Sequence, residues 1–276
     1  MVRTLTGREL AASLRAEVAA RVEAGPQPRL AVVVATADEA SLWYVRSIAK
    51  AAAGVGITCD LVDLGPDAET ERIRQTLARL SADDAVHGVM LQTPLPAGAS
   101  LQDLAGAIDP AKDVDGANPL SLGRLAAGLP AFAPATAAAV LALLDHYGVE
   151  LSGARAVVVG RSTVVGKPLA HLLLDRHATV TVCHSRTRDL AAVTSTAEVL
   201  VAAVGRAGLI GAEHVAPGAV VIDVGTNPTE DGGLVGDVDF DAVAGRAAAL
   251  TPVPGGVGPV TTALLLSHTA RAAGLR

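Results

Sequence analysis

Two glycines, Gly160 and Gly166, separate a short apolar run from a helical pattern. The run, residues 156–159, has the composition of a strand buried on both faces of a parallel sheet. Gly160 permits a tight turn, and Gly166 allows the segment 165–174 to pack closely on that sheet. A helix that begins there offers free backbone N–H groups and a positive dipole end, which suit a pyrophosphate. Because the spacing is not G-x-G-x-x-G, an ordinary strand–helix turn is the alternative interpretation.

The next predicted strand, residues 178–183, ends beside Ser185 and Arg186, with no acidic residue at this end. A carboxylate there usually holds the ribose 2′-hydroxyl of NAD, whereas the 2′-phosphate of NADP requires a cation. Arg161, in the glycine turn, could converge with Ser185 and Arg186, and a guanidinium binds phosphate oxygens bidentately. We therefore predict NADP rather than NAD. The alternative is that Arg186 and Arg188 form a solvated pair beside a helix.

The composition describes a globular chain with an unusual core. Its 276 residues suffice for one large domain or two smaller ones. Hydrophobic residues make up 50% but aromatic residues only 2%, so the cores must consist mainly of Ala, Val and Leu. The net charge of −6 and the pI near 5.6 give no basic surface for nucleic acid. An anionic ligand must therefore be bound by local groups.

Cysteine usage and the N-terminal segment indicate a cytoplasmic protein. Cys59 and Cys183 are too few for a disulfide framework, and no Cys/His cluster has the spacing of a metal site. Residues 1–20 carry interspersed charges in a helical period, unlike a signal peptide. Because no uncharged run is long enough to span a bilayer, we expect a soluble protein without a membrane partner.

Strands and helices alternate along the chain. We predict helices over residues 6–23, 40–55, 67–82, 101–108, 134–147, 165–174 and 261–273. The predicted strands are 29–35, 57–64, 86–91, 156–159, 179–183, 199–204, 219–224 and 248–251. This alternation indicates right-handed βαβ units, and therefore an α/β fold with parallel sheets. Two lobes of this kind place a ligand in the cleft between them.

Six stretches carry a family resemblance. They are residues 40–45 (ASLWYV), 92–96 (QTPLP), 112–116 (KDVDG), 160–168, 221–225 (VIDVG) and 251–259 (TPVPGGVGP). In these the chain resembles the bifunctional methylenetetrahydrofolate dehydrogenase/methenyltetrahydrofolate cyclohydrolase (FolD) family. The resemblance implies a homodimer, an N-terminal folate lobe (1–133, completed by a helix at 260–276) and a Rossmann-like NADP-binding lobe (134–259).

The resemblance also implies roles for individual residues. Tyr44 would stack along the folate, Asp115 would accept hydrogen bonds from the pterin, and Gln92 would lie beside the reacting carbon. Gln92 could equally cap a strand end. The implied substrate loop contributes Pro254, Gly255, Gly256, Gly258 and Pro259. The implied cofactor residues are Gly160, Arg161, Ser162, Val165, Gly166, Ser185, Arg186 and Thr226.

One position departs from the family pattern. The family has lysine four residues after the tyrosine, where this chain has Ile48. Residues four apart on a helix differ by about 40°, so position 48 shares a face with Tyr44. Lys50, roughly 240° round from Tyr44, should point elsewhere. The family lysine serves as the acid/base of the cyclohydrolase step, and such a group contributes about 10²–10⁴-fold.

Three functional hypotheses follow. The first is an NADP-dependent methylenetetrahydrofolate dehydrogenase whose cyclohydrolase activity is weak or absent, because hydride transfer depends mostly on positioning. The second is a fully bifunctional enzyme that also forms 10-formyltetrahydrofolate. The third is a non-catalytic folate- or nucleotide-binding protein.

Overall fold

The computed structural model describes residues 2–229 and 231–275, and the chain divides into two compact units. One unit, here called the three-stranded unit, consists of Ala12–Ala135 and the segment from Thr262. The other, the six-stranded unit, consists of the residues up to Ala11 and of Thr136–Thr261. In the part of the chain that the structure describes, no helix is both long and apolar enough to cross a membrane.

The three-stranded unit is a parallel sheet of order β3-β2-β4 with helices on both faces. Its elements are α1 (Arg8–Glu23), β2 (Arg29–Val34), α2 (Glu39–Ala53), β3 (Thr58–Asp63), α3 (Thr70–Ala82), β4 (Gly88–Leu91), α4 (Leu101–Ala105), α5 (Pro119–Ala126) and most of α10 (Val257–Ala272). Asp38 is the N-cap of α2, because its carboxylate accepts a hydrogen bond from the Ser41 N–H at 2.8 Å.

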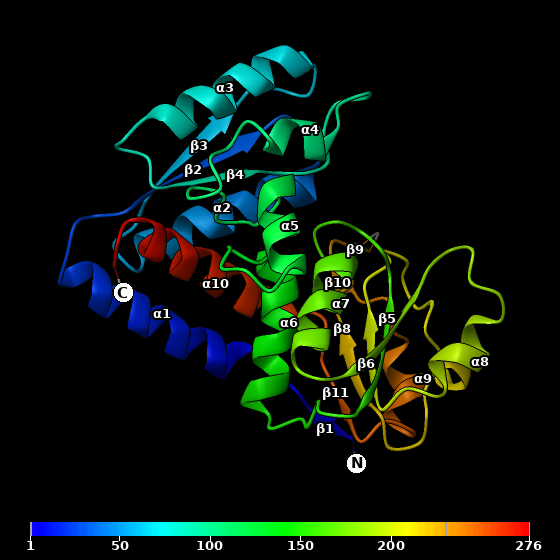
Figure 1. The fold of residues 1–276 in the computed structure, drawn as a ribbon. Helices are drawn as coiled ribbons and strands as arrows, with labels where there is room; N and C mark the ends of the chain where they lie inside the picture. Colours follow the sequence, from blue (N-terminus) through cyan, green and yellow to red (C-terminus); the bar gives the residue numbers. More distant parts are fainter. Residues whose placement is uncertain (1, 230, 276) are drawn as a thin grey trace. The chain divides into compact units, whose positions relative to one another are not determined.

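Alternate residues of β2 enter two separate hydrophobic clusters. Leu30 and Val32 pack in a cluster with side chains of α1, α2 and α10, whereas Ala31 and Val33 pack with side chains of α3 and α4. Successive side chains of a strand point to opposite faces, so this central strand is buried on both. Figure 1 shows α3 and α4 on one side of the sheet and α2 and α10 on the other.

The six-stranded unit is a parallel sheet of order β1-β11-β8-β7-β5-β6. Its strands are β1 (Arg3–Thr4), β5 (Arg155–Val159), β6 (Thr179–Cys183), β7 (Val199–Ala202), β8 (Val220–Asp223) and β11 (Ala249–Leu250). Its helices are α6 (Ala135–His146), α7 (Gly166–Asp175), α8 (Leu190–Thr194) and α9 (Phe240–Ala244), with a 3₁₀ turn, η1 (Ala212–His214). A small antiparallel hairpin joins β9 (Asn227–Pro228) to β10 (Leu234–Val235).

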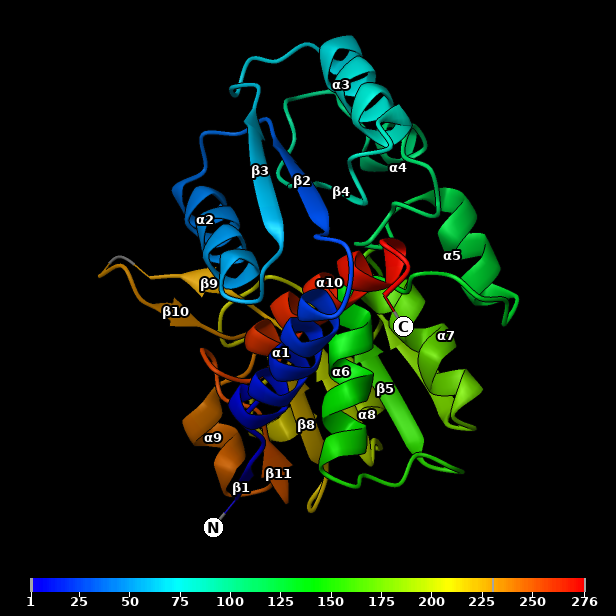
Figure 2. The same ribbon diagram turned by 90° about the vertical axis from the view of Figure 1, so that its left-hand side faces the viewer.

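The apolar strands predicted in this unit form its buried centre. One face of the sheet packs a cluster that includes Val157, Leu200 and Val221 against side chains of α8 and α9. Figure 2 shows α6 over the other face, and both α6 and α7 contribute fully buried leucines, Leu143 and Leu169 among them. The α/β fold with parallel sheets, predicted from alternation, is confirmed.

Several boundaries differ from the sequence prediction. The chain up to Ala11 belongs to the six-stranded unit rather than to the N-terminal lobe, because β1 pairs with β11. The closing helix begins at Val257, earlier than the predicted residue 261. The short elements β1, β9, β10, α5, α8, α9 and η1 were not predicted.

Candidate functional site

The glycine turn follows β5 and packs against the residue that follows β7. Gly160 has φ +130°, and a Cβ at this position would lie 2.2 Å from the Ala203 carbonyl oxygen. A Cβ on Gly166 would lie 2.0 Å from the carbonyl oxygen of Gly160. Both positions therefore require glycine, the first for its conformation and the second for the close approach of α7 to the turn. These are the two roles that the sequence predicted.

The segment between the two glycines leads into the start of α7. Ser162 Oγ accepts a hydrogen bond from the Val165 N–H at 3.1 Å, and the Ser162 carbonyl accepts one from the Lys167 N–H at 3.0 Å. Arg161 and Ser162 are exposed, whereas Val165 is half-buried. The turn thus leads into a helix N-terminus, whose positive dipole end suits a pyrophosphate.

The loop after β6 lies next to this turn, because the Gly160 N–H donates to the Cys183 carbonyl at 2.9 Å. His184 orders the loop: its N–H donates to Thr187 Oγ1 at 2.8 Å, and its Nδ1 accepts from the Arg186 N–H at 3.2 Å. Ser185 and Arg186 are exposed. The backbone therefore brings the two predicted phosphate-binding segments together, at the carboxyl ends of adjacent strands.

Two buried carboxylates tie the loops after β7 and β8. Asp237 accepts hydrogen bonds from the N–H groups of residues 204, 205 and 206 at 2.6, 3.0 and 2.8 Å. Asp223 accepts from the N–H groups of residues 225, 237 and 238. Burial raises the pKa of Asp223 to about 6 despite these donors. Thr226, a predicted cofactor residue, follows Gly225 in the loop after β8 and is exposed. Asp223 stands in one of the six stretches that carry the resemblance, but the sequence indicated no role for either carboxylate, because each binds a loop that is distant in sequence.

The predicted substrate loop is shorter than expected. Gly255 has φ +109°, and its carbonyl accepts a hydrogen bond from the Gly7 N–H at 2.9 Å. Gly258 and Pro259 lie in the first turn of α10 rather than in a loop. Proline is tolerated there because the first N–H groups of a helix have no partner within it. Pro254 is exposed and Gly256 is buried.

Tyr44, on α2, points its phenol at groups from two other segments. Its hydroxyl is hydrogen-bonded to the Thr262 side chain, and it interacts electrostatically with Asp115. Burial, followed by the negative charge of Asp115, raises the pKa of Tyr44 well above its ordinary value. The phenol is therefore neutral at physiological pH. Sequence reasoning did not identify Thr262, which lies in an apolar helix without a motif of its own.

Asp115 carries a carboxylate that accepts no hydrogen bond from the described residues. Its neighbour Asp113 has a different role, since it accepts hydrogen bonds from the Ala117 and Asn118 N–H groups at 3.0 and 2.9 Å and so holds the turn. Burial, followed by the charge of Asp113, raises the pKa of Asp115 to about 7. The half-buried Asp115 side chain is the one suited to an external donor.

Gln92 follows β4 and is buried. Its Nε2 donates to the carbonyl of Thr93 at 2.6 Å, and Ser41 Oγ donates to the same oxygen at 3.0 Å. Ser41 is on the first turn of α2, one turn before Tyr44. The structure thus links Gln92 to the helix that carries Tyr44, while its amide also holds the end of the strand.

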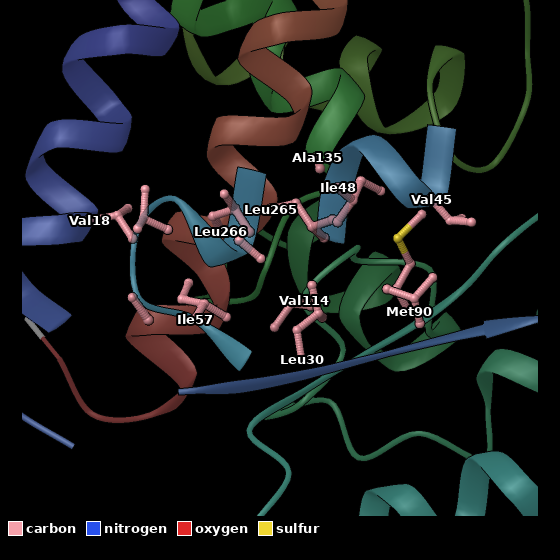
Figure 3. Close-up of a cluster of buried hydrophobic side chains, with 14 of the residues drawn as sticks. Val18, Leu30, Val45, Ile48, Ile57, Met90, Val114, Ala135, Leu265 and Leu266 are labelled. Atoms are coloured by element: carbon pink, nitrogen blue, oxygen red, sulfur yellow. The ribbon is translucent and has the colours of Figure 1, made fainter. Parts of the chain in front are cut away.

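Ile48 is fully buried in the cluster that includes Val45, Met90 and Leu266 (Figure 3). Lys50 is exposed and lines a surface groove with Trp43. The other lysine of this unit, Lys112, donates from Nζ to the Asp83 carbonyl at 2.7 Å. Within the described residues of the three-stranded unit, therefore, no ammonium group is directed at Tyr44.

Comparison with known proteins identifies the family. A model described as the tetrahydrofolate dehydrogenase/cyclohydrolase catalytic domain matches residues 5–115, and one described as the NAD(P)-binding domain of the same enzymes matches residues 134–276. The chain belongs to the tetrahydrofolate dehydrogenase/cyclohydrolase family. The glycine turn lies in the range of the NAD(P)-binding domain and fits a dinucleotide, whereas Tyr44, Gln92 and Asp115 lie in the range of the catalytic domain.

Individual members of the tetrahydrofolate dehydrogenase/cyclohydrolase family are closely similar. Bifunctional protein FolD 1 of Saccharopolyspora erythraea is 70% identical over 275 residues, which cover 98% of this chain and 94% of that protein. The bifunctional FolD structure from Campylobacter jejuni has a TM-score of 0.95, with 38% identity and 99% of each chain covered. The Trypanosoma brucei FolD structure, complexed with NADP cofactor and inhibitor, has a TM-score of 0.93, with 37% identity and 98% and 97% covered.

Proposed function

We propose that this chain is an NADP-dependent enzyme that oxidises 5,10-methylenetetrahydrofolate to 5,10-methenyltetrahydrofolate. The observation that carries the proposal is the pairing of Asp115 with Tyr44 in the catalytic domain of a chain of this family. Asp115 is half-buried and accepts no hydrogen bond from the described residues, and its charge acts on the buried phenol of Tyr44. A carboxylate and a ring in this arrangement suit a pterin, which offers amino and ring N–H donors on a planar system.

Three residues of the three-stranded unit have roles in this proposal. Asp115 accepts hydrogen bonds from the pterin, and these bonds favour its ionised form against the burial that raises its pKa. Tyr44 stacks along the folate as a neutral phenol. The Nε2 of Gln92 donates to Thr93, so we expect Oε1 to be the atom that meets the substrate.

The six-stranded unit would hold NADP. Gly160, Ser162, Val165 and Gly166 form the turn and helix start that suit its pyrophosphate, and Arg161, Ser185 and Arg186 would bind the 2′-phosphate. We assign Thr226 to the cofactor and residues 254–259 to the junction of nicotinamide and folate. Bound NADP supplies a hydride acceptor. The contribution of the chain is to align the two reactants, and alignment is the main requirement of hydride transfer.

The names of the relatives favour the bifunctional alternative, in which the chain also hydrolyses the methenyl product to 10-formyltetrahydrofolate. This second reaction needs water addition and proton transfer at nitrogen, and therefore a positioned acid/base. A separate observation keeps the dehydrogenase-only hypothesis as the other candidate. The position that carries lysine in the family is the buried Ile48, and neither lysine of the three-stranded unit is directed at Tyr44.

One assay tests these possibilities together. Purified protein is mixed with NADP and 5,10-methylenetetrahydrofolate, and the absorbances of NADPH and of the methenyl product are followed simultaneously. Dehydrogenase activity produces NADPH. Methenyl product that accumulates in step with NADPH favours the dehydrogenase-only candidate, whereas methenyl product that disappears as fast as it forms favours the bifunctional one. Saturable NADP binding without NADPH formation would instead indicate a non-catalytic binding protein and reject the proposal.

We also propose that the chain forms a homodimer, as the resemblance implies. Light scattering coupled to size-exclusion chromatography should give twice the chain mass of 27.6 kDa. A mass equal to one chain at assay concentration would contradict this.

A further inference from the structure

His268 is a buried histidine on α10 that the proposed chemistry does not use. Its Nδ1 lies 2.8 Å from the carbonyl oxygen of Val114. A carbonyl can only accept a hydrogen bond, so Nδ1 carries the proton and donates it. Burial lowers the pKa of His268 to about 4, and the charge of Arg271 acts in the same direction. The ring is therefore neutral at physiological pH, and this donor is present throughout the neutral range.

The hydrogen bond from His268 holds the peptide that leads into Asp115. The Val114 carbonyl and the Asp115 N–H belong to one planar peptide unit, so fixing that oxygen also fixes the plane from which the Asp115 side chain departs. Val114 itself is fully buried, beside Leu30 and the α10 leucines (Figure 3). The contact joins residues 154 positions apart in sequence.

The surroundings of His268 restrict the same loop from a second direction. The Phe132 ring lies 5.1 Å from the His268 ring, and Arg271 lies over the Phe132 ring at 5.3 Å. Gly116, which follows Asp115, has φ +67°, and a Cβ there would lie 2.7 Å from the carbonyl oxygen of Phe132. The segment at Phe132 therefore packs on both His268 and the residue after Asp115.

Asp113 holds the part of this turn that follows Asp115. Its carboxylate receives the Ala117 and Asn118 N–H groups, which lie after Asp115. Asp115 thus lies between a side held by Asp113 and a peptide held by His268. Without His268, the Val114 carbonyl would be a buried acceptor without a side-chain donor, and the peptide could rotate to seek another partner.

We propose that His268 is a positioning residue that aims the Asp115 carboxylate at the folate by holding the Val114–Asp115 peptide. The inference rests on the proposed function, since it assigns a second residue to the same folate site. According to this proposal, position 268 must supply an N–H donor at the place of Nδ1, and neither an aromatic ring nor a charge is required there.

The test is a donor series at position 268. His268→Asn keeps an N–H at the place of Nδ1, His268→Gln moves it to the place of Nε2, and His268→Leu removes it. We expect KM for the folate to rise roughly 10-fold in the Leu and Gln variants, while the Asn variant stays near wild type and KM for NADP changes little. An equal rise in all three variants, or no rise in the Leu variant, would overturn the proposal.

Thr269→Val is the matched control, because it removes a buried hydrogen bond of α10 that serves only the helix, from Oγ1 to the Leu265 carbonyl at 2.9 Å. It should lower stability without raising KM for the folate. The same rise in Thr269→Val would show that the effect is general destabilisation, and would reject the proposal.

Hydrogen exchange of the peptide spanning residues 113–118 gives a readout that needs no turnover. We expect faster exchange in His268→Leu and His268→Gln, and wild-type rates in His268→Asn and Thr269→Val. Unchanged exchange in His268→Leu would overturn the inference. A wild-type protein that forms no NADPH but shows this exchange pattern would contradict the proposed function while leaving the positioning contact established.

Discussion

Ile48 lies one turn after Tyr44 on α2, and the two side chains meet different surroundings. The Tyr44 hydroxyl is hydrogen-bonded to Thr262 and interacts electrostatically with Asp115, whereas Ile48 is fully buried in the hydrophobic cluster drawn in Figure 3. Positions four apart lie on one face of a helix. An amine at position 48 would therefore emerge beside the phenol, where the chain instead has hydrocarbon.

Ile48→Lys tests whether this position limits hydrolysis. If wild type accumulates the methenyl product, we expect the variant to hydrolyse it about 10²-fold faster or more, the usual contribution of a positioned acid/base. The substitution should also cost roughly 2–4 kcal/mol of unfolding free energy, because an ammonium group enters a buried site. The decay of methenyl absorbance and a urea denaturation curve measure the two effects.

Ile48→Met is the control, because methionine has an unbranched chain like that of lysine but no amine. It should cost less than about 1.5 kcal/mol and leave hydrolysis unchanged. If wild type already hydrolyses the methenyl product and Ile48→Lys folds but gains nothing, another group supplies the acid/base, and the bifunctional alternative stands.

Asp115 should make stability depend on pH in a defined direction. Its pKa is about 7 in the folded chain, above the ordinary value near 4 of an unfolded aspartate. The folded state therefore binds an extra proton between about pH 4 and pH 7, so the contribution of Asp115 to stability is fully present below this window and is lost as pH rises through it.

Asp115→Asn isolates that contribution, because asparagine does not titrate. The difference in unfolding free energy, wild type minus variant, should fall between pH 4 and pH 7 in chemical denaturation. A difference that stays flat or rises across this range would contradict the assignment. In the same variant we expect a large rise in KM for the folate, since asparagine offers one acceptor atom instead of two and its NH2 group would face a donor of the pterin.

The sequence was sufficient for the parts of the fold that have strong local patterns. Residues 156–159 and 179–183 are apolar and β-branched, and both are strands in the structure. In contrast, β1 has only two residues, Arg3 and Thr4, both exposed, and exists because β11 pairs with it. No pattern in these two residues predicts a strand. The sequence therefore could not show that the chain up to Ala11 belongs to the six-stranded unit.

The same distinction applies to the candidate site. Asp115 and the two glycines stand in short motifs whose residue types carry the chemistry. Thr262 and His268 lie in an apolar helix, and their significance depends on contacts with Tyr44 and Val114, far away in sequence. A histidine on an apolar helical face is ordinarily interpreted as structural, and only the position of its Nδ1 relative to Val114 gives it a further role.

Gly166→Ala should disrupt the turn that we assign to NADP. The added carbon would lie 2.0 Å from the Gly160 carbonyl oxygen, so the helix start or the turn must move. We expect a loss of about 1–3 kcal/mol in unfolding free energy and of measurable NADP binding by calorimetry. Gly123→Ala is the control: it lies within α5 with no atom near its Cβ position, and should stabilise the chain by roughly 0.5–1 kcal/mol. Unaltered NADP affinity in Gly166→Ala would remove this turn from the cofactor site.

Arg186→Ala tests the preference for NADP over NAD. Arg186 is exposed, its N–H is held by His184, and no carboxylate stands at this strand end. A charge-assisted hydrogen bond to phosphate contributes about 1.5–3 kcal/mol, so NADP affinity should fall roughly 10- to 100-fold. NAD has no 2′-phosphate, and its affinity should change little. Arg188→Ala removes the same charge two residues later and should affect neither cofactor. An equal loss in the Arg188 variant, or a parallel loss of NAD binding, would mean that Arg186 acts through general surface charge, because only a specific contact distinguishes the two cofactors by their phosphate.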